Sequence, residues 1–262
     1  HCKLCMIVRE EDGGLNRYLH LATGNYNPAT AKLYTDFGLM TCQPDFGEDV
    51  ARVFNLLTGF CKFEGTDKLI VAPFDFQTRI LELIHRETEH AKRNNPARII
   101  AKMNALVDKP VIEALYAASQ AGVKIDLIVR GICCLRPGVP EFSANITVRS
   151  IVDRFLEHSR IYSFANGGNS EVFIGSGDWM HRNFHKRIEV AFPIEDASLK
   201  KHVLDEVLPT HLNDNVKAHL LQPDGSYIKL SPDKDEGFIQ SQSRFIGSLQ
   251  GNKDPQPPEN QN

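Results

Sequence analysis

No stretch of the sequence is apolar for long enough to cross a membrane, and no signal-peptide pattern is present. An excess of positive charge is missing as well, because 30 lysines and arginines stand against 33 aspartates and glutamates, for a formal net charge of −3 at pH 7. This balance argues against a broadly basic surface that coats nucleic acid, so we expect no nucleic-acid partner. A polyanion remains a compatible ligand if a few cations converge on one site.

Regularly spaced cysteine pairs are also lacking. The six cysteines show no disulfide-like pattern, which favours reduced thiols and a cytoplasmic protein, with peripheral attachment to a membrane as the alternative. Cys2 and Cys5 form a C-x-x-C pair, but they lie within an apolar strand pattern and no second pair stands at zinc-site spacing. We therefore expect Cys2, Cys5, Cys133 and Cys134 to pack in the core rather than to bind metal or carry redox chemistry.

With 262 residues, the chain is long enough to bury a core of its own and to form one large or two modest domains. Its apolar fraction of 42% and charged fraction of 24% are ordinary for a globular protein. The chain begins with His1 rather than Met, directly on a candidate strand, so we expect it to be part of a longer protein. Asp67 and Lys68 precede a short apolar strand, and a domain boundary is expected near them.

Alternating strand and helix patterns fill the middle of the chain. The clearest is a helix that Asp108 caps, that has Pro110 in its first turn and that ends at Gly122. Strand, helix, strand, helix, strand in succession predicts an α/β layer with a mostly parallel sheet. The expected helices are 28–33, 48–60, 76–94, 108–122 and 199–211, and the expected strands are 1–8, 17–23, 69–72, 98–103, 124–129, 146–149, 160–164, 171–174 and 186–192. Apolar content falls from residue 231, and we expect a disordered tail over 251–262.

Two motifs of the same kind stand far apart in the sequence. His1 and Lys3 open one strand, and His158 and Arg160 open another. Since strand side chains alternate, each histidine shares a face with its cation. A turn of small residues with Asn or Asp follows in both cases. Two such units brought face to face would form a pocket of the size of a phosphate group.

The residue types of these motifs suit phosphoryl transfer. A neutral imidazole is a competent nucleophile near pH 7, because its unperturbed pKa is about 6.5. Attack on a phosphoryl group gives a phosphohistidine, which divides one hard displacement into two easier ones. Fixed cations aimed at the phosphoryl oxygens stabilise their charge, and Arg130 ends a buried strand where ligands of α/β sheets usually bind. The cations near the motif ends are Lys3, Arg130, Arg160, Arg182 and Arg187.

Each residue also has an ordinary explanation. A histidine at a strand end is more often a hydrogen-bonded surface residue, an arginine after a strand is usually solvated, and a residue such as Tyr34 is more often part of a wall than a ligand. The repeated pairing is what favours a site. The remaining histidines lack this context, and we expect surface or structural roles for His85, His90, His181, His185, His202 and His211.

Longer motifs around these residues resemble a known family. They are HLATGNYNP at 20–28, LYTDFG at 33–38, NALVD at 104–108, LIVRGIC at 127–133, SIVDRFLEHSR at 150–160 and DWMHRN at 178–183, together with His1-x-Lys3. From residue 1 to about 220, the sequence resembles the C-terminal half of bacterial polyphosphate kinase.

The resemblance implies an α/β fold of phospholipase-D-like type. A mixed sheet flanked by helices would be preceded by a truncated domain of the same type. Residues 1–68 would be the remnant of the first C-terminal domain, 69–230 the second, and 231–262 a C-terminal extension with a disordered end.

The resemblance also implies an activity. That family reversibly transfers the terminal phosphate of ATP to inorganic polyphosphate through a phosphohistidine, with magnesium. ATP, ADP and polyphosphate would be the partners, and the full-length protein would be a homo-oligomer. The magnesium site is expected mainly upstream of residue 1, so no metal ligands are expected within this chain. Because those upstream parts are missing, we expect the chain alone to be inactive or impaired.

The roles of the site residues follow by position. His1 would be the phosphorylated histidine, with Lys3 as its charge partner. Tyr34, Arg130 and His158 would contact the nucleotide.

In addition, His158 would face His1 as the acid/base of the second half, and Arg160 would bind phosphate. His20 would be a supporting residue. Glu189 would orient an imidazole, or form an ion pair with Arg187, and the sequence leaves these two roles open. Ala22, where the family usually has glycine, is a mild departure.

Other functions are weighed against this one. A phospholipase-D-like phosphodiesterase would have an acid five positions after each cation, but Val8 and Ala165 occupy those positions. A non-catalytic polyanion-binding module would bind polyphosphate without a phosphohistidine. A structural α/β domain with incidental histidines fits the length of the motifs least well.

Overall fold

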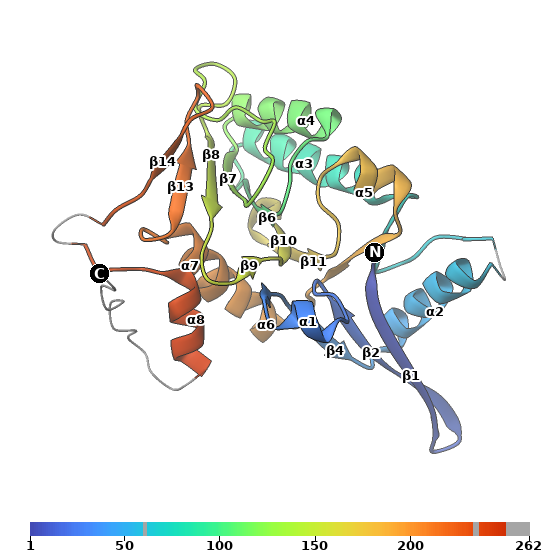
Figure 1. Cartoon of the computed structure of the whole chain (residues 1–262). Coiled ribbons are helices and arrows are strands. Elements are labelled where there is room, and N and C mark those ends of the chain that lie inside the picture. Colours follow the sequence, from blue (N-terminus) through green and yellow to red (C-terminus); the bar gives the residue numbers. More distant parts are fainter. Residues whose placement is uncertain (60–61, 233–235, 250–262) are drawn as a thin grey trace.

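A nine-stranded sheet forms the centre of the protein (Figure 1). The structure is a computed structural model that describes residues 1–59, 62–232 and 236–249. The strands lie in the order β14-β13-β8-β7-β6-β10-β11-β12-β5. Their bounds are β5 Ile70–Ala72, β6 Arg98–Met103, β7 Lys124–Val129, β8 Ile146–Ile151, β10 Arg160–Phe164, β11 Glu171–Gly175, β12 Glu189–Pro193, β13 Ala218–Leu221 and β14 Tyr227–Lys229.

Most neighbouring strands in this sheet are antiparallel, so the expectation of a mostly parallel sheet is wrong. Of the described pairs, β6–β7 and β7–β8 are parallel, and the others are antiparallel. A parallel pair needs a long crossover, and helix α4 (Lys109–Gln120) supplies one between β6 and β7. Shorter connections join β10, β11 and β12, which return the chain in the opposite direction. The mixed sheet flanked by helices that the resemblance implied is confirmed.

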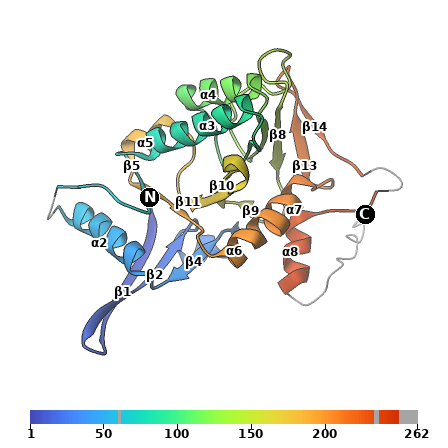
Figure 2. The same cartoon turned by 180° about the vertical axis from the view of Figure 1, so that it is seen from behind.

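Helices α3 (Phe76–Lys92) and α4 cover one face of the sheet (Figures 1 and 2). Their apolar stripes are buried in one core with the strands, as Ile84 of α3 and Leu115 of α4 show. The Asp108 carboxylate accepts the Val111 N–H at 3.2 Å, which confirms the predicted helix cap. No helix in the described part of the chain is long and apolar enough to cross a membrane.

Segments from both ends of the chain cover the opposite face. Leu21 of strand β2 (Gly14–Ala22) and Val50 of helix α2 (Pro44–Thr58) share a core with Val207 and Leu208. The helix expected over 199–211 is observed as α6 (Ala197–His202) and α7 (Leu208–Leu212), joined by a π-helical turn at Val203–Val207.

The N-terminal segment forms a small antiparallel sheet in the order β1-β2-β4. Besides β2 and α2, this segment contains β1 Lys3–Glu11, α1 Pro28–Ala31, β3 Tyr34–Thr35 and β4 Gly38–Thr41. Strand β3 leaves this sheet and pairs in parallel with β9 (Leu156–Glu157), which belongs to the second half of the chain. This pairing joins the two halves next to His158.

The structure differs from the expected elements in several places. Helix α5 (His181–Lys186) ends where a strand over 186–192 was expected, and β12 begins at Glu189. Strands β9, β13 and β14 and helix α8 (Ser241–Leu249) were not expected. Helix α8 escaped prediction because polar side chains anchor it, since buried Gln242 bonds to Phe155 and to Glu157. The tail expected over 251–262 lies outside the described residues.

The cysteine prediction is wrong in part. Cys2 and Cys133 are half-buried and pack against the cores, but Cys5 and Cys134 are exposed. In β1, Leu4 and Met6 face the core, so the alternation of the strand turns Cys5 outward.

One buried carboxylate ties α2 to the start of the large sheet. Asp49 is fully buried, and its oxygens accept the backbone N–H groups of Asp67, Lys68 and Leu69 at 2.6–3.0 Å. This contact fixes the connection between the small sheet and β5.

We expect Asp49→Ala to lower the free energy of unfolding by about 3 kcal/mol, because three backbone N–H groups lose a buried, charged acceptor. Urea denaturation of the chain checks this value. Asp45→Ala is the matched control: Asp45 is exposed in the first turn of the same helix, so its loss should cost only about 0.3–1 kcal/mol. Equal losses in the two variants would contradict the role of Asp49.

Candidate active site

His158 lies at the junction of β9 and β10. Its imidazole stacks on the ring of Tyr34, with centroids 4.8 Å apart and planes inclined by 22°. Parallel pairing of β3 with β9 holds Tyr34 in place, and the His158 N–H donates to the carbonyl of Thr35 at 3.1 Å. The two halves of the chain are thus joined at a residue that the sequence singled out.

Cationic side chains surround this imidazole. Arg160 is buried and donates to the two oxygens of Asp178 at 3.1 and 3.3 Å. Arg130, just after β7, donates to a backbone carbonyl of β9 at 3.1 Å. Burial, followed by the charges of Arg160, Lys3 and Arg130, lowers the pKa of His158 to about 3. The imidazole is therefore neutral at pH 7.

The start of β1 lies beside β12. The backbone N–H of Cys2 donates to the carbonyl of Ile188 at 2.9 Å, and His1 is exposed next to it. Lys3 is buried, which lowers the pKa of its ammonium, while the carboxylate of Glu189 opposes that shift. The charge of Lys3 also lowers the pKa of His158. The cation of the first motif therefore acts on the imidazole of the second.

Glu189 is buried at the floor of this region. It accepts hydrogen bonds from Ser176 Oγ at 2.5 Å and from Asn183 Nδ2 at 2.7 Å, and Arg187 lies 3.8 Å away. The ion pair with Arg187 is therefore present. The charge of Glu189 acts on Lys3, and no hydrogen bond in the described chain joins it to an imidazole.

Two buried polar atoms of the site have no hydrogen-bond partner among the described residues. They are Nδ1 of His158 and Oδ1 of Asn183. Buried polar atoms nearly always find a partner, so these atoms mark positions where a ligand can bind. With its proton on Nδ1, the neutral His158 can donate to a phosphoryl oxygen.

Lys102 is a site residue that the sequence analysis missed. Its buried Nζ lies 2.8 Å from Glu157 Oε2 and 2.6 Å from Ser159 Oγ, and these two residues flank His158. The network therefore fixes the backbone on both sides of the imidazole. A signal was available, because Lys102 is charged and stands between the apolar residues 99–101 and Met103 of β6.

Glu157 is held from several directions. Gln242 of α8 donates to it at 2.6 Å, Thr35 donates at 3.1 Å, and His211 Nε2 lies 3.4 Å away. Burial alone would raise the pKa of Glu157, but Lys102 and His211 hold it well below its ordinary range. His211, expected to be a surface or structural residue, is thus structural and supports the site.

A cavity of about 780 Å³ adjoins Tyr34 on the side of α7 and α8. Its lining includes Tyr34, Phe37, Phe155, Glu157, Asp205, Glu206, His211 and Phe245. The acidic side chains disfavour phosphate there, whereas the aromatic ones suit an uncharged ring.

The ring of His20, on β2, contacts the ring of Tyr26. His20 Nδ1 lies 2.9 Å from the hydroxyl of Tyr26, which donates to the His20 carbonyl at 3.1 Å. No contact in the described chain joins His20 to His158. The residues that the structure brings together are Lys3, Tyr34, Arg130, His158, Arg160 and Glu189, with His1 at the edge.

The described carboxylates near His158 do not fit a protein-held magnesium ion. Magnesium prefers carboxylate oxygens and water in octahedral geometry. Both oxygens of Asp178 accept hydrogen bonds from the Arg160 guanidinium, and Glu189 forms an ion pair with Arg187, so cations of the protein already neutralise both carboxylates.

A neutral imidazole close to three cations, with an unpartnered nitrogen, is an arrangement that suits a bound phosphate group. Comparison with known proteins identifies the family. The family model "Polyphosphate kinase C-terminal domain 1" matches residues 1–63, and "Polyphosphate kinase C-terminal domain 2" matches residues 69–242. The chain belongs to the polyphosphate kinase family.

Comparison with individual relatives supports the same family. Polyphosphate kinase of Synechocystis is 51% identical over 245 residues, covering 94% of this chain and 34% of the relative. That of Pseudomonas aeruginosa is 50% identical over 249 residues, covering 95% and 36%. The crystal structure of polyphosphate kinase from Porphyromonas gingivalis superimposes with a TM-score of 0.89 at 42% identity, covering 95% of this chain and 38% of that one. The chain thus spans about a third of the length of these relatives.

We expect the imidazole of His158 to stay neutral down to about pH 4, since its pKa lies near 3. Binding of tripolyphosphate should raise that pKa, because the anion offsets the neighbouring cations. NMR titration of the histidine ring signals, with His158 assigned from the His158→Gln variant, measures both effects. A midpoint near 6.5 in the free chain would contradict the electrostatic description.

Lys102→Met should lower the free energy of unfolding by about 3–5 kcal/mol, because it leaves the carboxylate of Glu157 buried without its cation. Lys92→Met removes an exposed ion pair with Glu89 and should cost less than about 1 kcal/mol. Chemical denaturation compares the two variants, and similar losses would show that the buried pair is not a structural support.

Proposed function

We propose that this chain is the part of an ATP:polyphosphate phosphotransferase that holds the transferred phosphate and the nucleotide. One observation carries the proposal. Lys3, Arg130 and Arg160 converge on the neutral, unpartnered imidazole of His158, next to the start of β1 that bears His1. Membership of the polyphosphate kinase family supports it.

In the proposed reaction, a ring nitrogen of His1 attacks the γ-phosphorus of ATP. A bond forms between that nitrogen and phosphorus, the bond from phosphorus to the β–γ bridging oxygen breaks, and ADP leaves. In the second step, a terminal oxygen of polyphosphate displaces the phosphoryl group from His1. Both steps are reversible.

The surrounding side chains have separate tasks in this scheme. Lys3, Arg130 and Arg160 stabilise charge on the phosphoryl oxygens, which is the main contribution a protein makes to such a transfer. The neutral imidazole of His158 donates a hydrogen bond to a phosphoryl oxygen without adding a further positive charge. Tyr34 keeps its ring in place by stacking.

We further propose that magnesium, if it takes part, is held outside the described carboxylates and enters with the nucleotide. ATP or ADP and inorganic polyphosphate are the proposed substrates. A cytoplasmic location, a homo-oligomeric full-length protein and the lack of a nucleic-acid partner remain expectations from the sequence and the family resemblance.

Of the alternatives, a diesterase lacks its acid, because the positions in question hold Val8 and Ala165. A polyanion-binding module is separated from the kinase by experiment. It predicts that polyphosphate binds without any phosphohistidine.

The full-length enzyme that contains this chain, incubated with γ-³²P-ATP, should acquire an acid-labile, base-stable label on the peptide that carries His1. His1→Gln should abolish the label while leaving polyphosphate binding in place, and His20→Gln should keep the label. Label on another residue, or undiminished label in the His1→Gln enzyme, would refute the assignment. Binding without any label in the wild-type enzyme would favour the binding module.

A further inference from the structure

A second group of polar residues lies outside the phosphate site, where α4 and α5 begin. Asp108 is 3% exposed, and its oxygens accept hydrogen bonds from Gln77 Nε2 at 2.9 and 3.0 Å and from the Val111 N–H. These donors are neutral, and Asp108 forms no ion pair with any described residue. A buried carboxylate usually has a cationic partner, so this one lacks part of its usual compensation.

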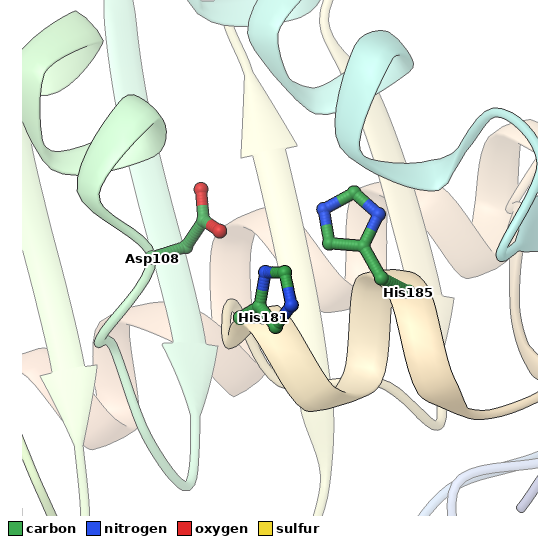
Figure 3. Close-up of side chains that lie close together, drawn as sticks. All are labelled: Asp108, His181 and His185. Atoms are coloured by element: carbon green, nitrogen blue, oxygen red, sulfur yellow. The ribbon is translucent and has the colours of Figure 1, made fainter.

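Two imidazoles face this carboxylate. His181 and His185 lie four residues apart on α5, so they share one side of the helix. Their ring centroids are 4.6 Å apart, and Figure 3 shows both rings beside the carboxylate of Asp108. Both residues are exposed, and neither ring has a hydrogen-bond partner among the described residues. One ligand atom from each of the three side chains lies within 4.8 Å of the other two.

We propose that Asp108, His181 and His185 bind one transition-metal cation of the zinc class. Zinc takes imidazole nitrogens and carboxylate oxygens at about 2.0–2.2 Å, with water completing an open tetrahedral site. Small rotations of the exposed rings bring the three atoms to that spacing. Two nitrogen ligands select against magnesium, which prefers oxygen.

The surroundings of the three residues are those of a metal site. Gln77 orients the carboxylate in the way that an outer hydrogen bond orients a metal ligand. The cations Arg182 and Lys186 follow each histidine by one position, which rotates them about 100° around the helix.

The metal would connect two parts of the fold. It would cross-link α5 to the first turn of α4, where the Asp108 N–H already donates to the carbonyl of Trp179 at 3.0 Å. The opposite side of α5 carries Asn183, which donates to Glu189 in the phosphate site. The proposed ion therefore stabilises the helix that holds a wall of that site. The proposal does not depend on the reaction assigned above.

Titration of the chelator-treated full-length protein, free of any histidine tag, tests the site. Isothermal titration calorimetry with ZnCl₂ should show a site at one ion per chain that MgCl₂ does not fill. His181→Gln and His185→Gln should each weaken zinc binding at this site by about 100-fold or more, since removal of even an outer hydrogen bond to a ligand costs about 10–100-fold. Zinc should also raise the melting temperature of the wild-type protein and slow hydrogen exchange in α5, and both effects should vanish in these variants.

Matched variants separate the loss of zinc binding at this site from misfolding and from zinc binding elsewhere. Asp108→Asn retains a capping oxygen for Val111 but removes the charge, so the protein should fold and bind zinc weakly. His85→Gln changes an exposed histidine on α3 and should bind zinc like the wild type. Exposed cysteines are another possible source of ligands, and Co²⁺ absorption without thiolate-to-metal bands excludes them. Unchanged zinc affinity in both histidine variants, or no binding in the wild type, would overturn the proposal.

Discussion

Several cations can lie close to His158 because each of the buried ones has a buried carboxylate of its own nearby. Arg160 pairs with Asp178, Lys102 with Glu157, and Lys3 is stabilised by Glu189. Without these partners, cations in a buried site would lose hydration and repel one another. Glu189 belongs to β12 of the large sheet, Asp178 follows β11 by three residues, and Glu157 lies in β9, three residues before β10 begins. Strands of the large sheet and of the β3–β9 pair therefore place the carboxylates that allow these cations to lie close together in a chain with a net charge of −3.

The same arrangement keeps His158 neutral. Its pKa is low because the ring is partly buried and its nearest charges are positive. An anionic ligand reverses the sign of that environment, so ligand binding and proton binding at this ring favour each other. Tyr34 stacks on one side of the imidazole, and Nδ1 has no hydrogen-bond partner among the described residues, so this nitrogen is free to bind a ligand.

The site also depends on both halves of the chain. Strand β3 reaches over to β9, helix α8 returns from the C-terminal segment to hold Glu157, and Asp49 fastens α2 to the start of β5. These contacts are polar and join residues far apart in the sequence. Together with the apolar core that Leu21 and Val50 share with later elements, they hold the N-terminal segment against the large sheet. The matches to two family domains cover both parts of this arrangement.

Much of the local structure could be predicted from sequence. The cap at Asp108, the stop at Gly122 and the buried strands 98–103 and 124–129 depend on neighbouring residues, so local patterns suffice. Strand direction was predicted wrongly, because it depends on how each connection crosses the sheet. Helix α8 was missed because its anchor, Gln242, is polar and its partners are more than 80 residues away.

For the candidate site, the sequence by itself determined the pairing of His1 with Lys3 and of His158 with Arg160, and the place of Arg130 at a strand end. Residue type and i, i+2 spacing are local properties, so they can be read directly from the sequence. Only the tertiary structure decided that Lys102 supports His158, that the ring of His20 contacts Tyr26, and that Asp108 meets His181 and His185. Those relations depend on burial and on contacts between distant segments, which exist only after the sheet has formed.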